Sequence, residues 1–207
     1  MKRFIEFIFE KANALHVYDI DDTLVRPTAK IHVKDHTGKI VKTLNTHEYA
    51  KSSRSALPAG HSYDFSEFRS ADKFNRESTP IKPMISHVRL TSANKNNKVI
   101  FNTARSNLDD KSKFVDTFKK QGVDMKKIHV LRAGNISSPG TGPQKKAKIV
   151  SGYIRSHNPS EVHMYDDDTG NLDHFLKLKE QHPNVKFYAH HVQSDGTHKP
   201  YNNENVS

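Results

Sequence analysis

Two aspartates near the N-terminus, Asp19 and Asp21, are the residues whose types and spacing could do chemistry. They end a short apolar run and are followed by the hydroxyl of Thr23. On a strand, alternate side chains share a face, and at the carboxyl end of a strand in an α/β sheet they converge on a ligand. Two carboxylates so close repel unless a cation or a shared proton separates them. This pattern favours one ionised aspartate that attacks phosphorus and binds a hard cation, and a second, protonated one that gives its proton to a leaving group.

Two later apolar runs also end in polar residues. The run at 98–102 leads into Thr103 and Arg105, and the run at 161–165 leads into Asp166 and Asp167. From about residue 98, strand patterns alternate with helical patterns at βαβ spacing, which predicts an α/β fold, a three-layer Rossmann-like parallel sheet covered on both faces. The polar residues would then lie at corresponding strand ends.

The segment between these motifs reads as an insertion. We expect a core domain formed by residues 1–25 and 93–195, an inserted cap over 26–92, and a disordered tail over 196–207. Before the insertion we expect an amphipathic helix over 1–10. Within the insertion we expect a hairpin at 29–34 and 39–44 with Gly38 in its turn, a short helix at 46–51, a strand or aromatic plug at 63–68, and a helix beginning near Pro83. The core should then continue with strands at 98–103, 127–131, 161–165 and 185–192, separated by helices near 114–118, 149–154 and 172–178.

The composition excludes several classes of protein. The 207 residues suffice for one domain with a sizeable insertion, and the absence of cysteine excludes disulfides, thiolate zinc sites and thiol nucleophiles. This composition suits a reducing cytoplasm, where we expect the protein to reside. No apolar run approaches the ~18 residues that a membrane span needs. The basic start resembles a signal peptide, but Glu6 and Glu10 interrupt its apolar region and no small-residue cleavage site follows.

The net charge of +10 has two explanations. A basic surface attracts phosphate-rich partners such as nucleic acid, and it also simply keeps a protein soluble. The lysines are scattered, and no aromatic–basic interleaving matches a recognised nucleic-acid module. Charge alone therefore leaves both explanations open.

The run His16-Val-Tyr-Asp-Ile-Asp-Asp-Thr-Leu24 resembles the first motif of the haloacid dehalogenase-like phosphatases, Asp-x-Asp-x-Thr after a hydrophobic strand. The resemblance continues through an apolar strand ending in Thr103-Ala-Arg105, which is similar to the second motif. A strand ending in Asp166-Asp167 resembles the fourth. The four motifs together span roughly residues 15–192.

The third motif of that family is a lysine upstream of the last strand, and Lys145, Lys146 and Lys148 compete for it. Lys145 and Lys146 lie one helical turn before Ile149 and Val150 on the buried face, whereas Lys148 points further away. We favour Lys146, with Lys145 as the alternative.

The resemblance implies a role for each residue. Asp19 would be the nucleophile, and Asp21 would protonate the leaving oxygen and later deprotonate water. Thr103 and the lysine, Lys146 or Lys145, would hydrogen-bond the phosphoryl oxygens. Mg²⁺ would be held by Asp19, the Asp21 carbonyl and Asp166, with Asp167 nearby. Arg105 would contact substrate, or else form a surface ion pair.

The resemblance implies a phosphorylated substrate without naming it. Thr-Ala-Arg and Asp-Asp are similar to branches that act on nucleotides and nucleic-acid ends, among them phage-type repair enzymes, so we expect a phosphorylated small molecule or nucleic-acid end. The polar, hairpin-like insertion departs from the family's usual helical cap. The alternative is a catalytically idle domain of the same fold that binds nucleic acid or a protein through its basic surface.

Overall fold

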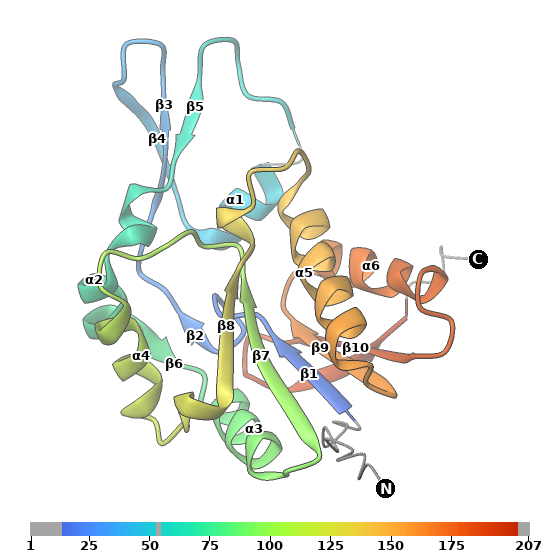
Figure 1. Cartoon of the computed structure of the whole chain (residues 1–207). Coiled ribbons are helices and arrows are strands. Elements are labelled where there is room, and N and C mark those ends of the chain that lie inside the picture. Colours follow the sequence, from blue (N-terminus) through green and yellow to red (C-terminus); the bar gives the residue numbers. More distant parts are fainter. Residues whose placement is uncertain (1–13, 53–54, 203–207) are drawn as a thin grey trace, which may run out of the picture.

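A six-stranded sheet forms the centre of the computed structural model, which describes residues 14–52 and 55–202 (Figure 1). Its strands lie in the order β11-β10-β9-β1-β7-β8. The parallel strands are β1 (Ala14–Tyr18), β7 (Asn97–Thr103), β8 (Ile128–Arg132), β9 (Glu161–Asp166) and β10 (Lys186–Val192), and β11 (His198–Tyr201) pairs antiparallel with β10. The predicted α/β class and parallel sheet are confirmed. The expected helix at 1–10 lies outside the described residues.

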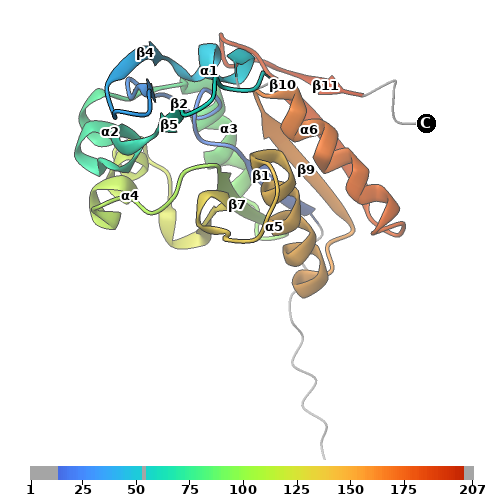
Figure 2. The same ribbon diagram turned by 90° about the horizontal axis from the view of Figure 1, so that it is seen from above.

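Helices cover both faces of the sheet because the central strand is apolar on both sides. Every residue of β1 is buried, and alternate residues enter different clusters. Leu15 and Val17 pack with α5 (Gly142–His157) and α6 (Thr169–Leu176), whereas Tyr18 packs with α3 (Lys82–Ala93) and α4 (Lys111–Lys119). Figure 2 shows α5 and α6 together on one side of the sheet. Short 3₁₀ turns complete the core at η2 (Met125–Lys127), η3 (Ala133–Asn135) and η4 (Lys177–Glu180).

The strand order reverses beside β1. The chain passes from β1 to β7 and β8 on one side, and then returns to β9 and β10 on the other. In open α/β sheets, ligands bind outside the carboxyl ends of the strands at such a switch point. The residues that follow β1 and end β9 therefore occupy the favoured position for a site.

A segment with its own small sheet is inserted between β1 and β7. Its neck is the antiparallel pair β2 (Val25–Arg26) and β6 (Thr79–Pro80), and residues 27–78 between them are called the inserted segment below. The segment contains β3 (Ile31–Lys34), β4 (Ile40–Leu44), α1 (Thr46–Ser52), β5 (Ser62–Asp64), η1 (Ser66–Arg69) and α2 (Ala71–Glu77). Its three strands project beyond the sheet in Figure 1.

The predicted hairpin and short helix of this segment are present. Gly38 has φ +84° in the turn between β3 and β4, a conformation that favours glycine. Of the strand or aromatic plug expected at 63–68, only its start is strand, and 66–69 forms a 3₁₀ turn. The last part of the expected 26–92 insertion, α3, packs against β7 and shares a hydrophobic cluster with β1.

The prediction of a disordered tail from residue 196 is wrong for the part that the structure describes. Residues 198–201 form β11, and a tight turn precedes it, with Gly196 at φ +84° and the Asp195 carboxylate accepting the N–H of Thr197 (2.9 Å). Asp-Gly is a strong hairpin signal. The polar composition of the tail masked this signal.

Within residues 14–52 and 55–202, none of the helices combines the length and the apolar character that a membrane span requires.

Stacked rings fill the sheet face beside α3. His16 lies 4.7 Å from His163, and Tyr165 lies 4.6 Å from Tyr18 and 4.4 Å from His190, all centroid to centroid and nearly parallel. We call the whole set the imidazole–phenol cluster: His16, Tyr18, His87, His163, Tyr165, Tyr188, His190 and His198. Burial, followed by the neighbouring histidines, lowers the pKa of His16 to about 3 and of His190 to about 4.

We expect His16→Phe to protect the fold against acid. In the unfolded chain, His16 is protonated below its ordinary pKa of 6.5. In the folded protein its pKa is lowered to about 3, so it stays neutral down to that pH. Stability is therefore full above pH 6.5 and is lost as the pH falls through this window. Nδ1 of His16 is buried without a partner among the described residues, so phenylalanine removes no hydrogen bond of that atom.

Thermal unfolding at pH 7 and pH 5 checks this prediction. Between these two pH values, His16→Phe should lose about 1–2 kcal/mol less stability than the wild type. The exposed His36 gives a matched control, because His36→Phe should follow the wild type. Equal acid-induced losses in both variants would contradict a neutral, buried His16.

Candidate metal centre

Three carboxylates meet where the strand order reverses. Asp19 directly follows β1, where its N–H donates to the carbonyl of Tyr165 (3.0 Å), and Asp166 ends the neighbouring β9. Asp19 is 5% exposed and Asp166 0%. One carboxylate oxygen from each of Asp19, Asp166 and Asp167 lies within 4.8 Å of the others. Segments nearly 150 residues apart thus form one acidic group, as the strand-end argument requires.

Lys146 bridges two of these carboxylates. Its Nζ donates to Oδ1 of Asp19 (2.5 Å) and to Oδ2 of Asp166 (2.9 Å), and its side chain is only 3% exposed. The first turn of α5 is fixed by a capping box between Thr141 and Gln144, which places Lys146 on the buried face, one turn before Val150. The side-chain amide of Asn102 also donates to the carbonyl of Lys146 (3.0 Å). The ammonium is therefore held by the helix as well as by its ionic partners.

Asp166 and Asp167 are also held by residues after β9 and by Thr23 after β1. Oδ1 of Asp166 accepts from the side-chain amide of Asn171 (2.9 Å) and from the N–H of Asp168 (3.0 Å). The Thr23 hydroxyl donates to Asp167 (3.0 Å) and accepts that residue's N–H (3.1 Å). The carboxylate of Asp168 caps the N-terminus of α6 through the N–H of Gly170. These contacts fix the direction of each carboxylate before any ligand binds.

The group carries more negative charge than Lys146 compensates. Burial, then the charges of Asp166 and Asp21, raise the pKa of Asp19 to about 8 despite the neighbouring ammonium. Burial, then the charges of Asp166, Asp19 and Asp22, raise the pKa of Asp167 well above its ordinary range. Burial alone would lower the pKa of Lys146, but Asp166 and Asp19 raise it above its ordinary value. A cation bound by these carboxylates would offset their mutual repulsion.

The donor set fits a hard divalent cation. All three candidate ligands are carboxylate oxygens, which suit Mg²⁺ or Ca²⁺ better than softer metals. Asp19, Asp166 and Asp167 would hold the ion. Asp19 and Asp166 are buried and Asp167 is half-buried, and the closeness of the three carboxylates makes a positive ligand favourable.

Asp21 and Arg105 form a buried ion pair beside this group. Nε of Arg105 donates to Oδ2 of Asp21 (2.8 Å) and Nη2 donates to Oδ1 (2.6 Å). Arg105 Nη1 donates to the carbonyl of Phe68 (2.9 Å), and its side chain is 3% exposed. Of the two roles expected for Arg105, the ion pair is present, but the guanidinium lies under aromatic rings of the inserted segment and not at the surface.

The other predicted residues lie at the same edge of the sheet. Thr103 ends β7, is 1% exposed, and accepts the N–H of Arg105 on its hydroxyl (3.2 Å). Lys145 is half-buried, and within the described residues no ion pair joins it to the carboxylates. Thr23 also contacts the acidic group, although the sequence assigned it no role. Its place two residues after Asp21 was the available signal.

Fold and site together define the class: an α/β protein with a mostly parallel six-stranded sheet and a buried acidic group formed by Asp19, Asp166 and Asp167. Comparison with protein-family models, with curated proteins and with solved structures gave no match.

Proposed function

We propose that this chain is a Mg²⁺-dependent phosphomonoester hydrolase of the haloacid dehalogenase-like type, acting through an aspartyl-phosphate on Asp19. The observation that carries the proposal is the Lys146 ammonium, which bridges Asp19 and Asp166 within a buried group that has excess negative charge. A nucleophilic carboxylate, a fixed cation and an oxygen-rich cation site at one strand edge are the parts that phosphoryl transfer needs.

The proposed reaction has two steps. A carboxylate oxygen of Asp19 forms a bond to phosphorus while the bond from phosphorus to the ester oxygen breaks, and Asp21 gives its proton to the departing alcohol. Water then attacks the phosphorus of the aspartyl-phosphate, Asp21 takes a proton from this water, and the bond to Asp19 breaks to release inorganic phosphate. A bound Mg²⁺ would neutralise charge on the phosphoryl oxygens.

Other residues position the phosphoryl group in this proposal. The ammonium of Lys146 and the hydroxyl of Thr103 would hydrogen-bond its oxygens, with Lys146 remaining close to its present partners. The net charge of +10 supports an anionic substrate such as a nucleotide or a phosphorylated nucleic-acid end.

The test is phosphate release with and without metal. p-Nitrophenyl phosphate, nucleoside monophosphates and 3′- or 5′-phosphorylated oligonucleotides are incubated with the protein in Mg²⁺ or in EDTA. We expect release from at least one substrate, at least about 100-fold faster with Mg²⁺ because a divalent cation supplies several kcal/mol of charge stabilisation. Equal rates in Mg²⁺ and EDTA would contradict the proposal. Transfer to an added alcohol rather than to water would identify a phosphotransferase with the same intermediate.

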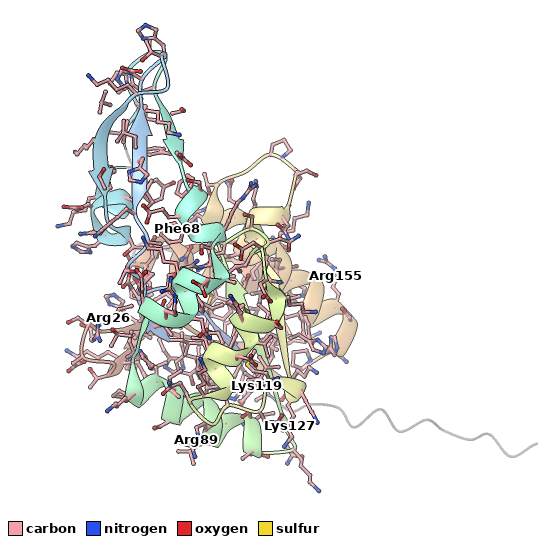
Figure 3. The ribbon with its side chains drawn as sticks, turned by 90° about the vertical axis from the view of Figure 1, so that its left-hand side faces the viewer. Arg26, Phe68, Arg89, Lys119, Lys127 and Arg155 are labelled. Atoms are coloured by element: carbon pink, nitrogen blue, oxygen red, sulfur yellow. The ribbon has the colours of Figure 1, made fainter. Side chains whose placement is uncertain are left out.

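An idle binding module is the second candidate. The +10 charge and the full engagement of Asp21 by Arg105 favour it. Of the basic residues labelled in Figure 3, Arg89 and Lys127 lie near each other, whereas Arg26 and Arg155 lie apart from them on other elements. Salt-sensitive binding of DNA or RNA with no hydrolysis of any phosphoester would support this candidate over the first.

A further inference from the structure

Arg105 is a buried cation at the joint between the inserted segment and the loop after β1. Two of its nitrogens hold both oxygens of Asp21 (2.8 and 2.6 Å), and the third holds the carbonyl of Phe68 (2.9 Å). Figure 3 shows Phe68 at the base of the projecting strands. One rigid, planar group therefore contacts the loop that carries Asp21 and the inserted segment at the same time.

Aromatic rings cover the guanidinium. Its central carbon lies 4.6 Å from the ring centroid of Phe68 and 4.6 Å from that of Phe74. Phe74 is fixed to the core by stacking on Phe114 (5.2 Å), whereas Phe68 belongs to the 3₁₀ turn that leads from β5 towards α2. Both rings over Arg105 therefore come from the inserted segment, but only Phe74 is also packed into the core cluster.

Three further hydrogen bonds join the inserted segment to the loops after β1 and β7. The Thr46 hydroxyl of α1 donates to the carboxylate of Asp22, the neighbour of Asp21. In the loop after β7, Asp109 accepts the N–H of Ala71 (2.8 Å) and donates its own N–H to Arg69 (2.9 Å). The inserted segment is thus held by hydrogen bonds against the loops that follow β1 and β7.

The strength of the Arg105–Asp21 pair depends on this seating. Charges attract strongly where water is excluded, and the attraction falls when water enters. If Phe68 lifts away, the guanidinium loses a hydrogen bond and an aromatic face and becomes hydrated. Its hold on Asp21 then weakens.

We propose that Arg105 is a positioning residue that couples the seating of the inserted segment to the direction in which the Asp21 carboxylate faces. With Phe68 seated, both oxygens of Asp21 face Arg105 and neither reaches a leaving group. Lifting of Phe68 frees the carboxylate to turn towards substrate. The role of Asp21 rests on the proposed function, whereas the coupling itself does not.

Hydrogen exchange tests the coupling without any assay of activity. In the full chain, Arg105→Lys keeps the charge but loses the planar fork, and Asp21→Asn removes the partner charge. Each should raise exchange of the backbone amides at 66–70 about tenfold or more, with amides of β1 and β7 unchanged. Arg76→Lys is the matched control, because Arg76 also pairs with an aspartate (2.7 Å) but is 66% exposed. Unchanged exchange at 66–70 in Asp21→Asn would overturn the proposal, even if Arg105→Lys fails to fold.

Leaving-group selectivity tests the consequence for catalysis. Phe68→Leu keeps an apolar side chain but removes one aromatic face from Arg105. An alkyl leaving group needs the proton of Asp21, whereas nitrophenolate departs without it. The kcat for an alkyl phosphate relative to p-nitrophenyl phosphate should therefore rise several-fold. Equal changes for both substrates would indicate a merely structural role and overturn the proposal. If no substrate is hydrolysed by the wild type, the proposed function fails and hydrogen exchange alone decides the coupling.

Discussion

Asp19→Asn should abolish phosphate release while the protein stays folded. The amide is nearly the same size as the carboxylate but cannot attack phosphorus, so we expect kcat to fall at least about 1,000-fold. Burial and neighbouring carboxylates raise the pKa of Asp19 to about 8, which means that its charge is unfavourable in the folded protein without metal. The neutral amide removes this cost, so unfolding temperature at pH 8 should remain equal or rise. The charge of Asp19 would then be needed for activity although it lowers the stability of the folded protein, as is common for functional residues.

Steady-state kinetics and thermal unfolding, measured on the same preparations, check both parts. Asp116→Asn is the matched control, since Asp116 is an exposed residue of α4 whose ion pair with Lys119 spans 3.5 Å. It should change neither kcat nor unfolding temperature appreciably. Activity of Asp19→Asn within tenfold of the wild type would remove Asp19 as the nucleophile. A large fall in unfolding temperature would contradict the electrostatic argument.

Local patterns predicted most of the elements but not their pairing. The apolar runs that became β1, β7 and β9 are bounded by polar turns, and the Gly38 hairpin carries its own turn signal. The imidazole–phenol cluster depends instead on neighbours. A histidine and a tyrosine two residues apart occur in three strands, at 16–18, 163–165 and 188–190. They stack only because β1, β9 and β10 are adjacent and in register, which no local pattern states.

The candidate site divides in the same way. Strand-end residues meet because parallel strands share a carboxyl edge, so the nearness of Asp19 and Asp166 follows from the alternation of strands and helices. Helical spacing similarly favoured Lys146 over Lys148. Arg105 could not be placed, because its partner Asp21 is 84 residues away and its cover, Phe68, comes from the inserted segment. The contacts of the inserted segment depend on where it packs against the core, and the alternation of strands and helices in the core does not predict that position.

Lys146→Met should produce the largest loss of stability of any single change at this site. The methionine fills a similar volume but leaves Asp19 and Asp166 buried without their shared cation. Removing one partner of a buried ion pair costs about 3–5 kcal/mol. Without the ammonium, the pKa of Asp19 rises further above about 8. A raised folded pKa gives stability at low pH that is lost as the pH rises through it. The wild type reaches this point at about pH 8 and the variant later, so the deficit of the variant should grow as the pH rises above about 8.

Added Mg²⁺ separates charge from packing in this variant. A divalent cation on Asp19, Asp166 and Asp167 supplies the missing positive charge, so Mg²⁺ should raise the unfolding temperature of Lys146→Met more than that of the wild type. Lys145→Met is the matched control, because it removes the same charge one residue earlier from a half-buried position without touching the carboxylates. Equal destabilisation of the two variants, or no response of Lys146→Met to Mg²⁺, would mean that the carboxylates neither depend on this lysine nor accept a cation in its place. Full stabilisation by Mg²⁺ with no recovery of phosphate release would instead assign Lys146 a direct part in holding the phosphoryl group, beyond balancing charge.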